Sequence, residues 1–319
     1  MNVHPRIVRR FLCALAAIAL IGFSVPAHAG INCSVSMTTV AFGSIDVLPG
    51  TAFDTTGTLS ITCSTDPNIT IHTCLSIAAG SANDATSRQM NGPSTTKLRF
   101  ELYSDSARTQ KWGSYVTGLY GGGIPFNFNS GSGNITQPVT VYARVLASQQ
   151  TTIPGSYTST FSGQPVLDYD DKGNACPLNA HTATSSFTAT ATVISSCNVS
   201  ATTHDFGSAS SLGSNVDATS TITTTCTSTT PYNIGLDAGT GSGATVTTRK
   251  MTAGAATINY SLYTNSGRTT VWGNTIGTNT VSGTGSGAGQ PLTVYGRVPS
   301  QATPAPATYT DTIVTTITY

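Results

Sequence analysis

The sequence predicts an all-β protein built from two tandem β-sandwich domains, and three observations lead to this prediction. Thr, Ser and Gly dominate the composition, and the scattered Val, Ile and Tyr side chains suit a pleated strand better than a helix. Short stretches alternate apolar and polar residues and are separated by clusters of Gly and Asn. The chain also repeats itself, with each copy about as long as one ordinary domain.

The start of the chain has the features of a secretory signal peptide. These are a basic start, an apolar stretch and an A-x-A cleavage motif, carried by Arg6, Arg9 and Arg10, by 11–25 and by 27–29. The apolar stretch is too short, and too directly followed by the cleavage motif, for a retained membrane span. We therefore expect 1–29 to be removed and the rest of the chain to be exported.

The exported part of the chain carries little charge. Charged residues make up 8% of the sequence, and the loss of three arginines with no acid lowers the formal charge from +1 to about −2. Such a chain offers no basic surface for nucleic acid. We therefore expect no nucleic-acid partner.

The internal repeat defines the two domains. The segment CSVSMTTVAFG matches CNVSATTHDFG, LRFELYSDSARTQKWG matches INYSLYTNSGRTTVWG without a gap, and QPVTVYARV matches QPLTVYGRV. These segments begin at Cys33 and Cys197, at Leu98 and Ile258, and at Gln137 and Gln290. The repeat predicts a first domain at 30–180 and a second domain at 181–319.

Each copy is expected to consist of short strands. Period-two alternation predicts strands at 58–63, 71–77, 98–103 and 139–145 in the first copy, and at 258–263, 292–298 and 309–319 in the second. Between the copies, the alternating segment 187–193 is a candidate strand for completing the first domain within the same chain. No useful length of chain shows helical periodicity, so we expect antiparallel sandwiches of immunoglobulin-like topology.

Six cysteines remain after the predicted signal peptide, which carries Cys13 away. An even number in an exported chain indicates disulfides. The repeat pairs Cys33 with Cys63 and Cys197 with Cys226, which leaves Cys74 and Cys176 to bridge within the first domain. No CxxC pair and no His/Cys cluster with zinc spacing is present, so no metal is expected.

The order of residues that the two copies share resembles the pattern of a known family. The residues that carry the resemblance are Cys33, Phe42, Gly43, Cys63, Met90, Tyr103, Trp112, Gly113, Tyr142, Arg144 and Tyr157, and then Cys197, Phe206, Gly207, Cys226, Met251, Tyr263, Trp272, Gly273, Tyr295, Arg297 and Tyr309. This pattern resembles the spore coat protein U domain, a family that includes the subunits of archaic, Csu-type chaperone-usher pili. Two such domains in one chain look like the tip adhesin of these pili.

The resemblance implies that the second domain is an incomplete pilin domain that needs a donor strand. A periplasmic chaperone, an outer-membrane usher and an adjacent pilus subunit are then the expected partners, and the expected location is the pilus tip at the cell surface, reached through the periplasm. The strand-accepting edge is expected at Thr310, Ile313, Thr315, Ile317 and Tyr319. The sequence ends at Tyr319 and leaves only 30–32 before Cys33, so we expect this subunit to accept a strand but not to donate one.

The connections of the first copy are more apolar than those of the second. They contain Val47, Leu48, Pro49, Phe53, Tyr115, Val116, Leu119, Tyr120, Ile124, Pro125, Phe126, Phe128, Ile153 and Pro154. These connections are expected to converge at one end of the first domain and to contact a surface. The alternative is that their side chains pack onto their own sandwich or onto the second domain.

The sequence thus favours a non-enzymatic tip adhesin that mediates surface attachment and biofilm formation. One alternative is a pilus lectin using Tyr120, Asn127, Phe128 and Asn129, and another is a secreted structural coat or matrix protein. Trp112 and Trp272 recur at one place in both copies, so they are expected in the cores. No catalytic motif surrounds the histidines, so neither enzymatic activity nor a cofactor is expected.

Overall fold

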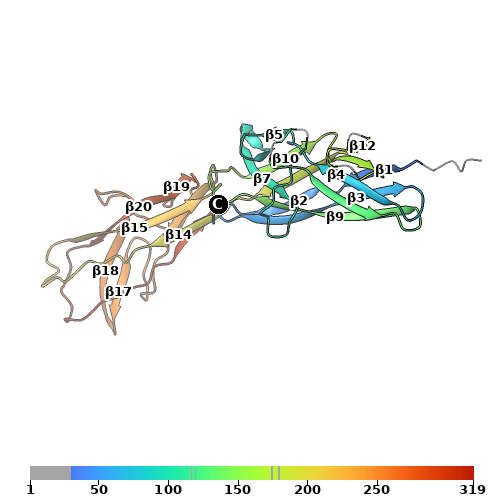
Figure 1. The fold of residues 1–319 in the computed structure, drawn as a ribbon. Helices are drawn as coiled ribbons and strands as arrows, with labels where there is room; N and C mark the ends of the chain where they lie inside the picture. Colours follow the sequence, from blue (N-terminus) through green and yellow to red (C-terminus); the bar gives the residue numbers. More distant parts are fainter. Residues whose placement is uncertain (1–29, 116, 119, 174, 179) are drawn as a thin grey trace, which may run out of the picture.

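The computed structural model describes residues 30–115, 117–118, 120–173, 175–178 and 180–319. The predicted signal peptide at 1–29 lies outside these residues. Two β-sandwiches follow one another along an elongated molecule (Figure 1). Within the described part of the chain, no helix is long and apolar enough to cross a membrane.

The first sandwich contains two hydrogen-bonded sheets. The larger sheet has the order β1-β3-β9-β7-β6-β10-β13-β2 with β5 beside β6, and the smaller one has the order β12-β11-β4-β8. The bounds are β1 Asn32–Met37, β2 Val40–Ile45, β3 Phe53–Ser64, β4 Thr70–Ser76, β5 Ala82–Asn83, β6 Arg88–Asn91, η1 Pro93–Thr95, β7 Lys97–Tyr103, β8 Ile124–Asn129, β9 Asn134–Val145, β10 Gly155–Phe161, β11 Val166–Asp170, β12 His181–Thr184 and β13 Phe187–Val193.

The second sandwich repeats this plan with fewer strands. Its sheets have the orders β14-β15-β20-β18-β17 and β19-β16-β21. The bounds are β14 Cys197–Ala201, β15 Val216–Cys226, β16 Pro231–Leu236, β17 Arg249–Ala253, β18 Ala256–Tyr263, β19 Val281–Thr284, β20 Gly289–Val298 and β21 Thr315–Thr318. Of the predicted strand at 309–319, only the part that forms β21 is a strand of a sheet in the structure.

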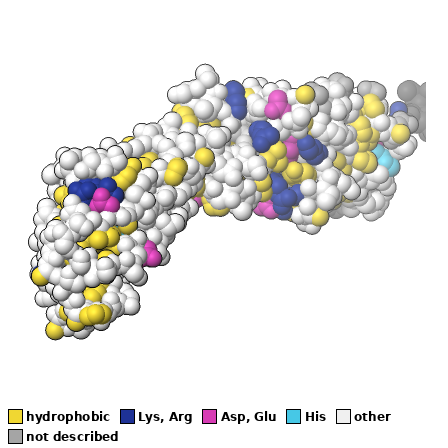
Figure 2. Space-filling view, turned by 90° about the vertical axis from the view of Figure 1, so that its left-hand side faces the viewer, with side chains coloured by type: hydrophobic (Ala, Val, Ile, Leu, Met, Phe, Trp, Pro, Cys, Tyr) yellow, Lys and Arg dark blue, Asp and Glu magenta, His cyan; other side chains and the backbone are white. Residues whose placement is uncertain are grey.

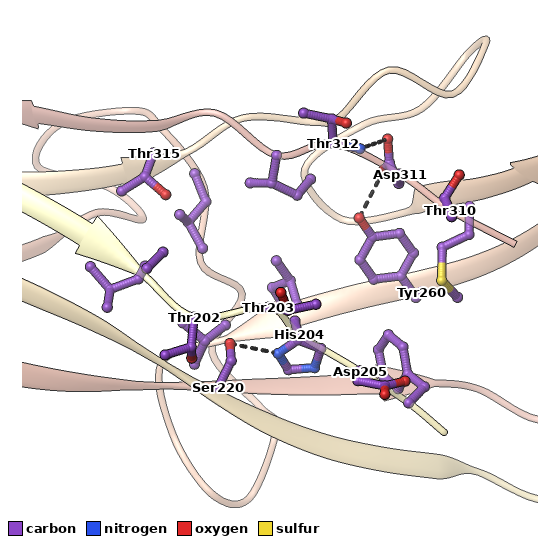
Figure 3. Close-up of a pocket in the computed structure, with 18 of the residues that line it drawn as sticks. Thr202, Thr203, His204, Asp205, Ser220, Tyr260, Thr310, Asp311, Thr312 and Thr315 are labelled. Carbon is purple, nitrogen blue, oxygen red and sulfur yellow. Dashed lines mark hydrogen bonds between the residues drawn. The ribbon is translucent and has the colours of Figure 1, made fainter. Parts of the chain in front are cut away.

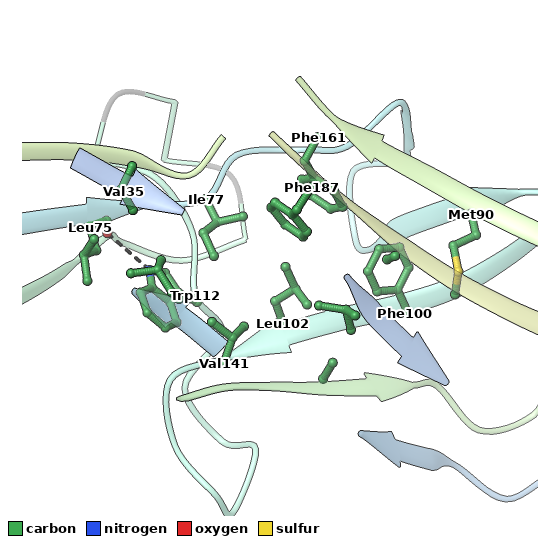
Figure 4. Packing of buried hydrophobic residues seen from close by; sticks show 14 of the residues in the cluster. Val35, Leu75, Ile77, Met90, Phe100, Leu102, Trp112, Val141, Phe161 and Phe187 are labelled. Atoms are coloured by element: carbon green, nitrogen blue, oxygen red, sulfur yellow. Dashed lines mark hydrogen bonds between the residues drawn. The ribbon is translucent and has the colours of Figure 1, made fainter. Parts of the chain in front are cut away.

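The alternation read from the sequence corresponds to inward and outward side chains. In β13 the inward residues are Phe187, Ala189, Ala191 and Val193, all buried, while Thr192 between the last two is exposed. Trp112 and Trp272 are each 1% exposed, and their indole N–H groups donate to the carbonyls of Leu75 and Ile234. The core of the first sandwich surrounds Trp112 (Figure 4), so both tryptophans pack as the repeat predicts.

All three predicted disulfides are present. Cys33–Cys63 and Cys197–Cys226 join directly opposed residues of β1 and β3 and of β14 and β15. Cys74–Cys176 ties β4 to the segment after β11 across 102 residues of sequence.

The first sandwich extends further along the chain than the predicted boundary at 180/181. β12 pairs with β11, and β13 pairs antiparallel with β10 and parallel with β2. The boundary therefore moves to the segment between Val193 and Cys197. β13 is also the strand that completes the first sandwich within the same chain.

Candidate functional site

The second sandwich contains an open groove of about 480 Å³. One wall is the segment 201–206 and the other is the segment 308–315 (Figure 3). The floor consists of core side chains, among them Ile222, Leu236, Leu262 and Val294. The groove thus gives direct access to the hydrophobic core from outside.

The same place in the first sandwich is filled. There β13 lies between β10 and β2, with seven residue pairs to β10 from Gly155↔Val193 to Phe161↔Phe187. The repeat equates β10 with 307–313 and β2 with 204–209. Among the described residues no strand lies between these two segments, so the second sandwich lacks the counterpart of β13.

The groove exposes an unpaired backbone edge. Thr310 uses both its N–H and its C=O to pair with Thr252. In an extended chain the backbone groups of successive residues point in opposite directions, so those of Tyr309 and Asp311 face the groove. Neither of these two backbones has a hydrogen-bond partner in the described part of the chain. An added strand would satisfy them, as β13 satisfies β10.

The upper wall of the groove carries a carboxylate. Asp311 Oδ2 accepts a hydrogen bond of 2.8 Å from the Tyr260 hydroxyl, and Oδ1 accepts from the Thr240 N–H and hydroxyl. Burial raises the pKa of Tyr260, and the bond to Asp311 raises this pKa further. Tyr260 therefore stays protonated and donates to the carboxylate at neutral pH.

The lower wall carries a histidine. His204 Nδ1 lies 2.8 Å from Ser220 Oγ, whereas the buried Nε2 has no hydrogen-bond partner among the described residues. A Cβ added at Gly296 would collide with this imidazole, so the ring fits only because position 296 is glycine. Burial lowers the pKa of His204, and the nearby Arg268 lowers it further. The imidazole is thus held in its neutral form.

The predicted accepting edge is only partly in the groove. Thr310, Ile313 and Thr315 line it. Ile317 packs against the core beside β16, and Tyr319 is 58% exposed beyond the groove. The sequence reasoning missed His204 and Tyr260, although comparison with Val40 and Phe100 in the first copy would have marked both as polar replacements of apolar residues.

Comparison with known proteins identifies the family. The model of the Spore Coat Protein U domain matches residues 19–163 and, a second time, residues 183–316. The chain belongs to the Spore Coat Protein U domain family. This description is that of a coat protein and not of an enzyme, in agreement with the sequence expectation.

Other comparisons add a relative and a fold. Protein U of Myxococcus xanthus is 41% identical over 87 residues, which are 27% of this chain and 48% of that protein, so the chain spans about half of the curated relative that it matches. The CsuC-CsuE chaperone-tip adhesion subunit pre-assembly complex of archaic Csu pili from Acinetobacter baumannii is similar with a TM-score of 0.52 and 17% identity, over 90% of this chain and all of the matched chain. The CupB6 tip adhesin of Pseudomonas aeruginosa has a TM-score of 0.39 and 10% identity, over 90% and 94% of the two chains.

Two of the apolar connections in the first Spore Coat Protein U domain lie together. The Ser148 N–H donates to the Gly50 carbonyl, and Gly50 abuts the Gln150 side chain. The Gln150 backbone in turn abuts Gly287 of the second domain. These two connections therefore do meet at one end of the first domain, but that end is the junction with the second domain, which agrees with the alternative of packing there and not with contact to a surface.

The expected exposure of Val47 and Leu48 requires correction. These side chains are 3% and 7% exposed. Leu212, the counterpart of Leu48 in the second domain, is buried as well, so the position is structural in both copies. In the same connections Pro49 is exposed, whereas Phe53, Ile153 and Pro154 are half-buried.

The long connection after Trp112 also packs against its own domain at one point. Tyr120 is 7% exposed, its hydroxyl donates to the Asp84 carbonyl, and Arg88 lies over its ring. This burial removes Tyr120 from the exposed set and from the set proposed for glycan stacking. Tyr115 is half-buried, and the expectations for Val116 and Leu119 lie outside the described residues.

The end of this connection is a strand rather than a loop. β8 pairs with β4 as an edge of the smaller sheet and corresponds to β19 in the second domain. Ile124, Phe126 and Phe128 are half-buried against the core, whereas Pro125, Asn127 and Asn129 are exposed. The strand thus accounts for apolar side chains that the sequence reasoning assigned to a loop.

Proposed function

We propose that the chain is the adhesive tip subunit of a chaperone-usher pilus. Its second domain accepts a strand from a partner, and its first domain, complete in itself, contacts the target. The observation that carries this proposal is the contrast between β13, which fills the first sandwich, and the open groove at the same place in the second. The likeness to the fold of a chaperone-bound tip adhesin supports it.

The groove supports partners that contribute an extended strand. It combines a free backbone edge with an opening onto buried apolar side chains, which is the arrangement used for strand addition. An edge of this kind is an aggregation hazard when uncovered, so a protective partner is needed before assembly. We assign this role to a periplasmic chaperone, and the later role to an adjacent subunit delivered by an outer-membrane usher at the cell surface.

The first domain supports a different task. Since β13 closes it, strand exchange is confined to the second domain. The first domain keeps half-buried aromatic side chains on the edge strand β8, where Phe126 and Phe128 lie 5.9 Å apart between their ring centres. We propose that this edge, with the exposed Pro125, contributes to attachment to apolar surfaces and to biofilm formation.

The strand-accepting role is tested by supplying the strand within the chain. A second copy of 186–194 is appended after Tyr319 through a Gly/Ser linker, as β13 is supplied in the first domain. We expect the unfolding midpoint of the second domain to rise by about 10 °C, because several apolar side chains leave water. Trp272 fluorescence in a Trp112→Phe background reports this transition, since the chain has one tryptophan in each domain.

The appended strand also provides its own controls. Inward Ala191→Asp and Val193→Asp changes in the appended copy should abolish the rise, whereas outward Thr190→Asp and Thr192→Asp changes should preserve most of it. An unchanged midpoint with the unmodified copy would refute a strand-accepting groove.

A further inference from the structure

The place that β13 fills in the first domain and the groove at the same place in the second domain differ in chemistry at one level, where a level is one row of residues paired across neighbouring strands. In the first domain Ala189 of β13 lies between Ser159 of β10 and Val40 of β2, and all three side chains are fully buried. The repeat puts Asp311 and His204 at the two flanking positions in the second domain. A small, nearly apolar site in one copy is thus a strongly polar site in the other.

The polar pair is built into the second domain by further replacements. Val40 lies over Gly57, whereas His204 meets Ser220, which stands at the position equivalent to Gly57. Ala143 of the first copy becomes Gly296, which makes room for the imidazole. Phe100 becomes Tyr260, whose hydroxyl binds Asp311 (Figure 3). Three further changes therefore support the same pair of groups.

Covering this level with an alanine would be unfavourable. Asp311 and His204 both line the open groove, through which water reaches the half-buried Asp311, whereas His204 Nε2 is already buried. An inserted strand removes that water, and a buried carboxylate that loses hydrogen bonds from water without replacement is costly. The uncompensated His204 Nε2 adds a second group at the same level. A hydrogen-bonding side chain on the incoming strand would replace the lost water.

The geometry points to a partner strand that carries a hydrogen-bond donor side chain, such as Ser, Thr or Asn, at the position that Ala189 holds in β13. This inference rests on the proposed strand-accepting function and specifies its partner. The strand runs antiparallel to 307–313. Its donor group lies between Asp311 and His204, and its other inward side chains are apolar.

The neighbouring levels of the groove support apolar side chains on either side of the donor. The residue equivalent to Phe187 would face Ile313, and the one equivalent to Ala191 would face Tyr309. At the last level Ala209 replaces Ile45, which pairs with Val193 in the first domain. The smaller alanine leaves room there for a larger apolar side chain. A polar residue is thus favoured at one level only.

Peptide binding to the full chain tests this chemistry. The reference peptide has the β13 sequence 186–194, the test peptide carries Ala189→Ser, and the matched control carries the outward change Thr190→Ser. We expect the test peptide to bind about tenfold more tightly than the reference, as for one additional hydrogen bond to a charged group. The control should bind like the reference. Fluorescence anisotropy of labelled peptides gives the dissociation constants.

Variants of the groove complete the test. A chain with His204→Val, Gly296→Ala and Asp311→Ser carries the first-domain residue at each of these three positions. It should lose the preference for the test peptide. Asp311→Asn, which keeps the side-chain shape, should reduce the preference and guards against misfolding of the triple variant. Equal binding of reference and test peptides by the wild-type chain would overturn this inference but leave strand acceptance intact. Failure of every peptide to bind would overturn strand acceptance itself.

Discussion

At the scale of single residues, each sandwich contains a fully buried arginine. Arg88 and Arg249 are both 0% exposed, and each donates to the main-chain carbonyl of its own tryptophan, Trp112 or Trp272. Arg88 also pairs with buried Glu101 at 2.9 Å, whereas Ser261 occupies the equivalent place and Arg249 donates to the Val246 carbonyl instead. The shared spacing Arg-x-Met in the repeat is the signal that could have revealed these arginines.

Replacement of Glu101 by the second-domain residue should destabilise the first domain. Glu101→Ser removes the carboxylate but does not supply the carbonyl that serves Arg249. The buried Arg88 guanidinium then keeps its main-chain acceptors but loses its charged partner. We expect a loss of about 3 kcal/mol in the free energy of unfolding. Urea unfolding followed by Trp112 fluorescence in a Trp272→Phe background measures it. The exposed-pair variant Arg144→Ala should cost less than about 1 kcal/mol, and similar losses for both variants would contradict the argument.

His204 should make the second domain less stable in mild acid. Its pKa in the folded state lies below the ordinary value of 6.5, so the unfolded state binds more protons. The free energy of unfolding should therefore fall as the pH drops below about 6.5 towards the lower folded value. The carboxylate Asp217, with its pKa lowered by the hydrogen bond from Arg297, loses its contribution only at lower pH.

The measurement compares the wild-type second domain with a His204→Val, Gly296→Ala variant between pH 7 and pH 5. His204 is the only histidine in 194–319, so the variant should lose most of the pH dependence. Equal slopes in the two proteins would show that another group titrates in this range.

At the scale of elements, β13 distinguishes the two sandwiches. It lies next to the end of the larger sheet, between the antiparallel β10 and the parallel edge strand β2, and it brings Phe187 onto Phe161 with ring centres 4.2 Å apart. Its period of two is visible in the sequence. Its position was not, because sheet pairing joins residues that are far apart in the chain.

A charge on the inward face of β13 should unfold the first domain. Ala189→Asp puts an unpaired carboxylate in a fully buried position, and we expect a loss of about 3 to 5 kcal/mol. The outward variant Thr192→Asp on the same strand is the matched control and should cost less than about 1 kcal/mol. Trp112 fluorescence during urea unfolding reports both. Equal costs on the two faces would be incompatible with β13 as an inserted strand.

At the scale of the whole molecule, the first strand and the last strand of the chain lie at different places along its length (Figure 1). Figure 1 shows the C-terminal end of β21 near the junction and the start of β1 towards the far end of the first domain. The few charged side chains on the face seen in Figure 2 lie singly or in mixed clusters. A surface without a strong field of one sign favours contacts that do not depend on charge.

Attachment to polystyrene should therefore persist in salt. We expect binding at ~1 M salt to be at least as strong as at ~0.1 M, because screening weakens charge pairs but not apolar contacts. Phe126→Ser should weaken binding about tenfold, and Asn127→Ser on the outward face of β8 is the matched control. Thermal unfolding confirms that both variants are folded. Collapse of binding at high salt would contradict an apolar mechanism.

The sequence by itself determined the repeat, the class of structure, the cysteine pairs and the core tryptophans. These follow from local periodicity and from self-comparison, which do not require knowledge of distant contacts. It also identified 187–193 as a strand. The exposure of the apolar connections was harder to predict, because the residue types of Leu48 and Tyr120 are the same whether their side chains face water or the core.

Only the tertiary structure decided where these segments lie. It placed β13 inside the first sandwich and showed an open groove at the same place in the second. It also put two apolar connections at the junction of the domains. It also joined Asp311, Tyr260 and His204, which are separated by many residues of sequence, around one groove. The physical reason is that a β-sandwich is held together by pairing and burial between distant segments, so exposure at any position depends on the strand that lies beside it.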